Sequence, residues 1–284
     1  MRFTSVRRSP VVASAMASVV AGLAVLGTTP AEADRYVDPT MLLPRGTGLL
    51  PDVGPHWPYV QQIQIDTVIP LKNQAIINRT EHGYLYRAGQ QDTQLVITVE
   101  DGRLQYADRG TEEWLWLPRP CRRVKVTEGV AASCRVPSGA EFPMLLEVWP
   151  RLGDDVVDSS ALRKRFDVAV LGDKGKDVVH LGAGDDFVNG AQGRDLTHGG
   201  LGRDWLRTGD GRDVIDGGGG GDHLVGVAGN DTVYGRGGDD RLGGDDGDNT
   251  IVSGEGADFV VCGPGWDDAW VDEEDRFVGC EAPQ

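Results

Sequence analysis

A repeat of nine residues constrains this chain more than any other feature, because it runs from Gly172 to Trp270 without an insertion. These 99 residues form eleven units in which three positions are nearly constant. The fourth position is Gly175, Gly184, Gly193, Gly202, Gly211, Gly220, Gly229, Gly238, Gly247, Gly256 and Gly265. The sixth position is Asp177, Asp186, Asp195, Asp204, Asp213, Asp222, Asp231, Asp240, Asn249, Asp258 and Asp267. The eighth position is Val179, Val188, Thr197, Leu206, Ile215, Leu224, Val233, Leu242, Ile251, Val260 and Ala269. Eleven units in one register predict a repeat architecture.

Each unit has the composition of a turn followed by a short strand. Six residues with several Gly suit a turn that needs positive φ or a close approach of two backbones. Three residues around one apolar position suit a strand with a single inward side chain. Two units then make one coil of 18 residues, and equivalent residues of successive coils lie ~4.7–4.9 Å apart in parallel ladders. The sequence therefore predicts an all-β fold with a thin core of eighth-position side chains.

Stacked coils would also bring the sixth-position carboxylates together in two rows. Asp177, Asp195, Asp213 and Asp231 are expected along one edge, and Asp186, Asp204, Asp222, Asp240 and Asp258 along the other. Rows of like charge at this spacing oppose folding unless cations lie between them. Ca²⁺ suits such a row because it takes about 6–8 oxygens from carboxylates and backbone carbonyls, whereas Mg²⁺ needs a tighter octahedron and keeps its waters. Several Ca²⁺ ions are the expected cofactor.

These eleven units resemble the hemolysin-type (RTX) calcium-binding repeat, and Gly199–Arg207 fits its nine-residue pattern in every position. The resemblance implies a parallel β-roll, that is, a right-handed β-solenoid of nonapeptide repeats over residues 172–270. It also implies that the eleven sixth-position side chains, together with backbone carbonyls of the turns that contain the fourth-position glycines, bind Ca²⁺ between units n and n+2. Asn249 departs from the pattern and offers one neutral oxygen, so the 231–249 and 249–267 sites are expected to be weaker.

The end of the chain is similar to that of small secreted calcium-binding proteins of Gram-positive actinobacteria. The shared features are a β-rich leader, a Cys pair, the repeats and an ending like Cys262-Gly263-Pro264-Gly265. Residues 271–284 are interpreted as a C-terminal cap, because a solenoid needs a polar cap over its last open edge.

The four cysteines outside the N-terminal segment are Cys121, Cys134, Cys262 and Cys280. An even number in an exported chain favours disulfides, and three pairings are possible. The local pairs Cys121–Cys134 and Cys262–Cys280 are favoured because each closes a short loop within one region. The chain has no CxxC motif and no clustered His to suggest zinc.

Residues 1–33 have the pattern of a cleavable export signal. Arg2, Arg7 and Arg8 precede an apolar stretch, and Ala31-Glu32-Ala33 suits a signal peptidase. We expect secretion to the extracellular space. The net charge of -16 argues against nucleic-acid and anionic-membrane partners and suits cations.

The first half is less informative. Residues 34–60 are Pro-rich and are expected to be extended, and residues 61–171 are expected to be a β-rich region that caps the roll. Gly153-Asp154-Asp155-Val156-Val157 resembles half a repeat out of phase with the rest. It is interpreted as part of the cap or an irregular coil, and a separate sandwich is the alternative.

No catalytic motif was found, since none of the five His lies in HExxH and no Ser lies in GxSxG. The predicted function is a secreted, non-enzymatic calcium-binding protein with a structural or interaction role. One alternative is an extracellular polysaccharide-active enzyme with a calcium-stabilised β-roll. In that case a sugar groove would be lined by Tyr84, Tyr86, Asp92, Asp108, Glu112, Glu113 and Trp114.

Another alternative is an adhesion module with an extracellular glycan or protein as partner. Alternate units place in their seventh position Phe187, Trp205, His223, Arg241 and Phe259. If the eighth position points inward, these side chains point outward. They would form either a binding stripe or an ordinary stack of in-register side chains.

Overall fold

The computed structural model describes residues 4–7, 71, 73–137 and 143–280. Within these ranges all regular elements are β-strands. No helix there is long and apolar enough to cross a membrane.

The strands that precede the repeats, or lie at their start, are short. They are β1 (Thr4–Arg7), β2 (Gln74–Arg79), β3 (Gly83–Arg87), β4 (Gln94–Glu100), β5 (Arg103–Asp108), β6 (Glu113–Trp116), β7 (Cys121–Val124), β8 (Val130–Arg135), β9 (Met144–Arg151), β10 (Val156–Asp158) and β11 (Phe166–Gly172). The strands of the repeats and of the C-terminal end are β12 (Lys174–Gly175), β13 (Val178–His180), β14 (Phe187–Asn189), β15 (Gln192–Gly193), β16 (Leu196–Leu201), β17 (Trp205–Gly211), β18 (Val214–Gly219), β19 (His223–Gly229), β20 (Thr232–Gly237), β21 (Arg241–Asp246), β22 (Thr250–Glu255), β23 (Phe259–Val261), β24 (Asp268–Val271) and β25 (Arg276–Val278).

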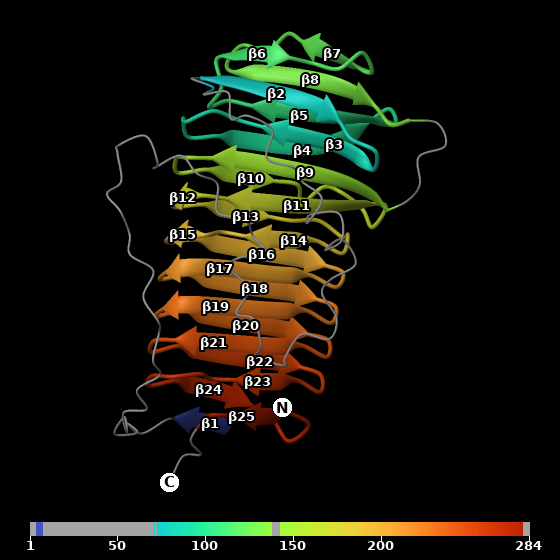
Figure 1. The fold of residues 1–284 in the computed structure, drawn as a ribbon. Helices are drawn as coiled ribbons and strands as arrows, with labels where there is room; N and C mark the ends of the chain where they lie inside the picture. The colour runs from blue at the N-terminus through green and yellow to red at the C-terminus, as the bar shows by residue number, and fades with distance from the viewer. Residues whose placement is uncertain (1–3, 8–70, 72, 138–142, 281–284) are drawn as a thin grey trace, which may run out of the picture.

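The strands form two long sheets that face each other and run the length of the molecule (Figure 1). Sheet A has 12 strands in the order β1-β24-β22-β20-β18-β16-β13-β10-β4-β5-β8-β7. Sheet B has 13, and its main path is β25-β23-β21-β19-β17-β14-β11-β9-β3-β2-β6. Through the repeats, strands one coil apart pair in parallel, so each coil contributes to both sheets. The predicted parallel β-roll is confirmed.

The core is a double column of side chains held in register. In sheet A the column is Leu95, Val157, Val179, Thr197, Ile215, Val233, Ile251 and Ala269. In sheet B it is Val148, Val170, Val188, Leu206, Leu224, Leu242 and Val260. All of them are at most 3% exposed. The eighth position of the repeat therefore points inward, as its apolar character predicts, and both columns continue beyond the repeats.

Residues 150–171 form a coil in register with the repeats. Val157 pairs with Val179 and Val170 pairs with Val188. Asp155 and Asp177 are 22 residues apart, whereas equivalent repeat residues are 18 apart. The four additional residues, 159–162, form a turn in which the Leu162 N–H donates to the Ser159 carbonyl at 2.8 Å. The apparent half-repeat is thus a complete unit, Pro150 to Asp158, and the sheets continue through it without a break.

Both ends of the roll carry a disulfide. Cys121–Cys134 joins β7 to β8 at the N-terminal end, and Cys262–Cys280 ties the C-terminal tail to the last repeat unit. The predicted pairing is confirmed.

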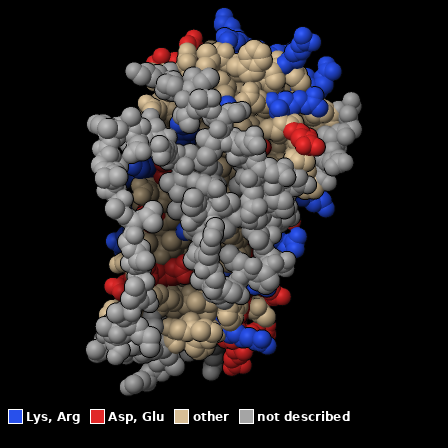
Figure 2. Space-filling view, in the orientation of Figure 1, with Lys and Arg blue, Asp and Glu red and all other residues tan. Residues whose placement is uncertain are grey.

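Figure 2 shows that Lys and Arg side chains gather at the end formed by β6 to β8.

Several sequence predictions concern parts of the chain that the structure does not describe. β1 pairs antiparallel with β24, but the rest of the predicted signal peptide (1–33) lies outside the described residues. The predicted extended segment (34–60) lies outside them entirely. The same holds for residues 281–284 of the predicted cap.

Candidate metal centre

The sixth-position side chains form two hydrogen-bonded rows along the edges of the roll. In each row, Oδ1 of one residue accepts the backbone N–H of the residue one coil earlier. Asp177 donates to Asp195 at 2.9 Å and Asp195 donates to Asp213 at 2.7 Å. The first row continues through Asp231, Asn249 and Asp267, and the second runs through Asp186, Asp204, Asp222, Asp240 and Asp258. The structure thus brings the predicted ligands together as two rows.

The second carboxylate oxygen, Oδ2, takes no part in the hydrogen bonds of these rows. It is buried and accepts no hydrogen bond from the described residues in Asp177, Asp195, Asp204, Asp222, Asp231, Asp240 and Asp258. These side chains are at most 3% exposed. A buried oxygen of an ionised group without a partner is strongly unfavourable. Binding a proton or a cation at each of these Oδ2 atoms would remove this cost.

Where the first position of the unit is Gly, it leaves a small space beside Oδ2 of the aspartate in that unit, whereas the unit of Asp258 has Ser253 there. A methyl group on Gly190 would lie 2.7 Å from Asp195 Oδ2 and 2.6 Å from the carbonyl oxygen of Thr208 in the next coil. A methyl group on Gly217 would lie 2.6 Å from Asp222 Oδ2 and 3.0 Å from the Gly235 carbonyl. A carboxylate oxygen and a carbonyl of the next coil thus face the same space, which we call the cradle.

The fourth-position glycines hold the turn in a shape that aims its carbonyls. Gly220 has φ +145° and Gly229 has φ +137°, values that L side chains rarely adopt. A methyl group on Gly220 would overlap the carbonyl of Gly202 in the preceding coil. The turns therefore stack with backbone against backbone, and only Gly fits.

Burial shifts the ionisation of these carboxyl groups. It raises the pKa of Asp177, Asp195 and Asp240 to about 7, and the pKa of Asp204 to about 9. Neighbouring aspartates in the same row raise them further, as Asp186 does for Asp204. Both effects disfavour the charged form. A divalent cation in the cradle would oppose both effects, because its positive charge favours the ionised form of the carboxyl group beside it.

The donor set fits Ca²⁺ better than a metal that prefers His or Cys. Among the residues of known placement, no three His, Cys, Asp or Glu side chains group closely enough to hold a metal by themselves. Backbone carbonyls would have to complete the shell, which hard cations accept and Ca²⁺ in particular uses. The cradle offers both kinds of oxygen.

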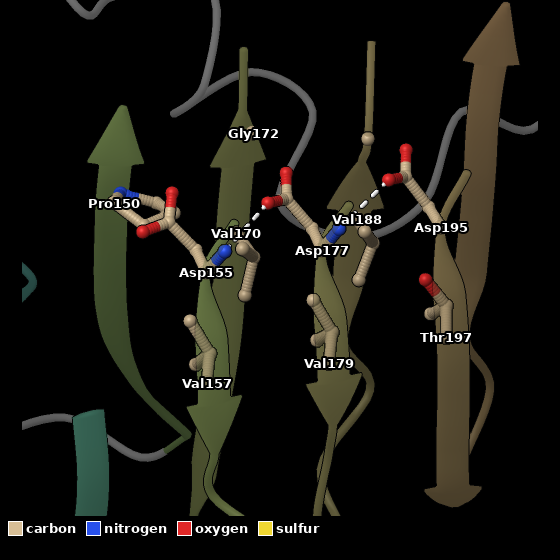
Figure 3. Close-up of a pocket in the computed structure, with 11 residues that line it drawn as sticks. Pro150, Asp155, Val157, Val170, Gly172, Asp177, Val179, Val188, Asp195 and Thr197 are labelled. Atoms are coloured by element: carbon tan, nitrogen blue, oxygen red, sulfur yellow. Dashed lines mark hydrogen bonds between the residues drawn. The ribbon is translucent and has the colours of Figure 1, made fainter. Parts of the chain in front are cut away.

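The first row extends beyond the predicted sites to Asp155, which sequence reasoning missed as a ligand. The Asp155 N–H donates to Asp177 Oδ1 at 3.0 Å, and Asp155 Oδ1 accepts the Thr93 N–H at 2.6 Å. Its Oδ2 is buried without a hydrogen-bond partner in the described chain, and burial raises the pKa of Asp155 to about 7. Figure 3 shows Asp155, Asp177 and Asp195 side by side with their carboxylates at the same height. One difference is that Pro150 stands where most units have Gly.

Two of the seventh-position side chains differ from the expected outward stripe, whereas Arg241 is exposed as expected. Phe187 and Trp205 are each only 5% exposed. Their ring centroids lie 4.9 Å apart, and the Trp205 indole N–H donates to His223 Nδ1 at 2.7 Å. Because the coils are in register, the two rings stack on each other. These two residues confirm the in-register stack, one of the two alternatives that the sequence left open, but they are buried and do not point into solvent as expected.

Four residues of the expected sugar groove also lie elsewhere. Tyr84, Tyr86, Asp108 and Trp114 are at most 4% exposed. The Tyr86 hydroxyl donates to Asp108 Oδ2 at 2.6 Å, and the Trp114 indole packs edge-on against Tyr86. They build the core of the N-terminal end and do not line a surface groove.

Comparison with known families agrees with the site geometry. The family model of the RTX calcium-binding nonapeptide repeat matches four times, at residues 170–196, 198–233, 216–251 and 225–260. Comparison with curated proteins and with solved structures gave no match. Residues 170–260 of this chain are RTX calcium-binding nonapeptide repeats, folded as a β-roll.

Proposed function

We propose that this chain is a secreted, non-enzymatic protein that binds several Ca²⁺ ions and folds its nonapeptides into the β-roll as they bind. The supporting observation is the buried Oδ2 atoms of Asp195, Asp222 and Asp240, each of which lies with a carbonyl oxygen of the next coil beside a first-position glycine. Two oxygens that face each other in a dry space repel unless a cation lies between them.

Calcium binding and folding are coupled in this proposal. Without the ion, the Gly-rich acidic segment must offset a large loss of chain entropy and the repulsion within each row. When the ion binds the folded coils only, its binding energy becomes folding energy. The roll should therefore be disordered at low calcium and ordered at the ~10⁻⁴–10⁻³ M range that extracellular modules use.

Far-UV circular dichroism of the metal-stripped chain at neutral pH tests this coupling. Strand signal should grow with added Ca²⁺, and Mg²⁺ at equal concentration should give a much smaller change. Full strand signal in a chelator, with no further growth on adding Ca²⁺, would refute the proposal.

Secretion and the absence of catalysis need tests of their own. Two disulfides suit an oxidising compartment, and they support export together with the signal-like N-terminus. Mass spectrometry of the culture medium should find a chain that starts at Asp34. A screen of the calcium-loaded protein against polysaccharides should release no new sugar ends, and their release would favour the enzyme alternative.

A further inference from the structure

Asn249 takes part in the first row with its oxygen, not its nitrogen. Its side chain is 1% exposed, and its Oδ1 accepts the Asp231 N–H at 2.9 Å. Because a backbone N–H only donates, the atom that faces Asp231 must be the oxygen. The amide nitrogen of Asn249 therefore lies where the aspartates have Oδ2.

This nitrogen is satisfied by its own turn. Nδ2 of Asn249 donates to the carbonyls of Asp245 and Gly247, both at 3.2 Å. A methyl group on Gly244 would lie 2.6 Å from this Nδ2 and 2.8 Å from the Cys262 carbonyl of the next coil. The –NH₂ group thus faces the cradle, and carbonyl oxygens surround it.

The turn that holds Asn249 has the same backbone shape as the aspartate turns. Asp245 and Gly247 have φ +58° and +127°, close to Arg236 and Gly238 of the preceding unit, with +80° and +127°. The carbonyls of all these turns should therefore have the same orientation. In an aspartate turn they face a carboxylate oxygen, and a cation must lie between. In the 244–249 turn the carbonyls face the two N–H donors of the Asn249 amide. Hydrogen bonds to these donors stabilise the carbonyls in place of a cation.

We propose that Asn249 takes the place of a calcium ion, so that the 244–249 turn closes by its own hydrogen bonds and binds none. A cation in the 244–249 turn would be repelled by the partial positive charge of the Asn249 N–H groups. It could bind the carbonyls only if both hydrogen bonds to Asn249 were broken. The prediction of a weakened site at 249–267 thus becomes a prediction of no site. This inference rests on the proposed function, since it concerns which cradles take the ion.

The second row also ends in a carboxylate that needs no metal. Asp275 Oδ1 accepts the Asp258 N–H at 2.9 Å. Its Oδ2 accepts the Ser253 hydroxyl and the Asp272 N–H, both at 2.7 Å. Both rows therefore contain a metal-independent closure near the C-terminal end of the roll, beside the Cys262–Cys280 disulfide.

Counting bound calcium in three full-length proteins tests the proposal. Asn249→Asp restores the Oδ2 atom and should bind one Ca²⁺ more than the unmodified chain. Asp222→Asn is the matched control, because Asp222 has the same Oδ1 bond, to the Asp204 N–H at 2.9 Å, and a Gly217 cradle. It should bind one fewer. Elemental analysis after equilibrium dialysis against Ca²⁺ gives the counts.

Two results would overturn the proposal in distinguishable ways. If Asp222→Asn loses an ion but Asn249→Asp gains none, Asn249 does not stand in for calcium and the proposed function survives. If none of the three proteins binds calcium, the proposed function fails as well. Anomalous diffraction from calcium-loaded crystals of the unmodified chain gives a test without variants. Peaks are expected beside Asp222 and Asp240, and a peak bonded to the 244–249 turn would refute the proposal.

Discussion

The backbone N–H of Asp177 donates to Oδ1 of Asp195 at 2.9 Å, while the second oxygen of Asp195 has no hydrogen-bond partner in the described chain. One carboxylate thus serves two purposes. Its first oxygen fixes the spacing of successive coils, and its second faces the cradle. This division explains why Asn is tolerated once in the row, since an amide keeps the first function and changes only the second.

The pH dependence of the metal-free roll follows from the buried carboxyls. Burial raises the pKa of Asp177 and Asp195 to about 7, whereas an unfolded Asp titrates near ~3.9. The folded state therefore binds more protons than the unfolded state between about pH 4 and pH 7. Stability of the metal-free form should be highest near pH 4 and should fall as pH rises through 7. Thermal unfolding in metal-free buffer at pH 4.5 and pH 8 measures it.

The control for this prediction is ionic strength. Salt screens exposed charges but reaches buried groups much less. Adding salt at pH 8 should therefore restore little of the stability gained at pH 4.5. A metal-free roll that is equally stable at both pH values would contradict the burial of charged aspartates.

The second prediction concerns the stability of the roll when a fourth-position glycine is replaced. Gly220→Ala places a methyl group over the Gly202 carbonyl at a φ of +145°, so the calcium-loaded roll should lose at least ~2 kcal/mol of stability. Gly243→Ala is the matched control, because the nearest atoms to its methyl group lie 3.8 Å away. Urea unfolding of both variants in saturating Ca²⁺ compares them. Equal midpoints would mean that the turns do not stack as described.

The sequence predicted the repeat region well because periodicity alone determines its coil. A nine-residue period with one inward apolar side chain leaves little freedom in register, so Leu206, Ile215 and Leu224 could be placed in the core without coordinates. The same period also predicted the rows of aspartates. The exposure of side chains was harder to predict. Phe187 and Trp205 form the in-register stack that the sequence offered as an alternative, but they are buried, whereas outward, exposed side chains were expected.

Asp155 and Asn249 show where pattern reading fails. Residues 159–162 shift the phase by four, so a search at a fixed period stops at Gly172 and sees only half a repeat before it. Inspection for a Gly-x-Asp-x-apolar core with a variable spacer would have found Asp155. The amide of Asn249 poses another problem, because its orientation depends on the Asp231 N–H one coil away.

Asp155 itself gives a third prediction. Asp155→Asn keeps an oxygen for the Thr93 N–H but removes the charged Oδ2, so the chain should bind one Ca²⁺ fewer. Asp154→Asn is the control, because Asp154 is exposed and its Oδ1 accepts the Lys176 N–H at 2.9 Å. The Asp154→Asn variant should bind the same number of Ca²⁺ ions as the unmodified chain. An unchanged count in Asp155→Asn would show that Pro150, at the place of the usual Gly, closes this cradle.

The C-terminal disulfide gives the last prediction. Cys262–Cys280 closes a loop with a sequence separation of 18 residues, and a loop of about that length contributes ~3 kcal/mol through the unfolded state. The Cys262→Ser, Cys280→Ser double variant should lose about this much in saturating Ca²⁺, as measured by urea unfolding. Its tail should also show faster hydrogen exchange at Asp258, whose N–H depends on Asp275. The matched Cys121→Ser, Cys134→Ser variant should leave exchange at Asp258 unchanged, since that disulfide joins β7 and β8 at the other end of the roll. Faster exchange at Asp258 in both variants would indicate a general loss of stability, and the tail would then not be held in place by its own disulfide.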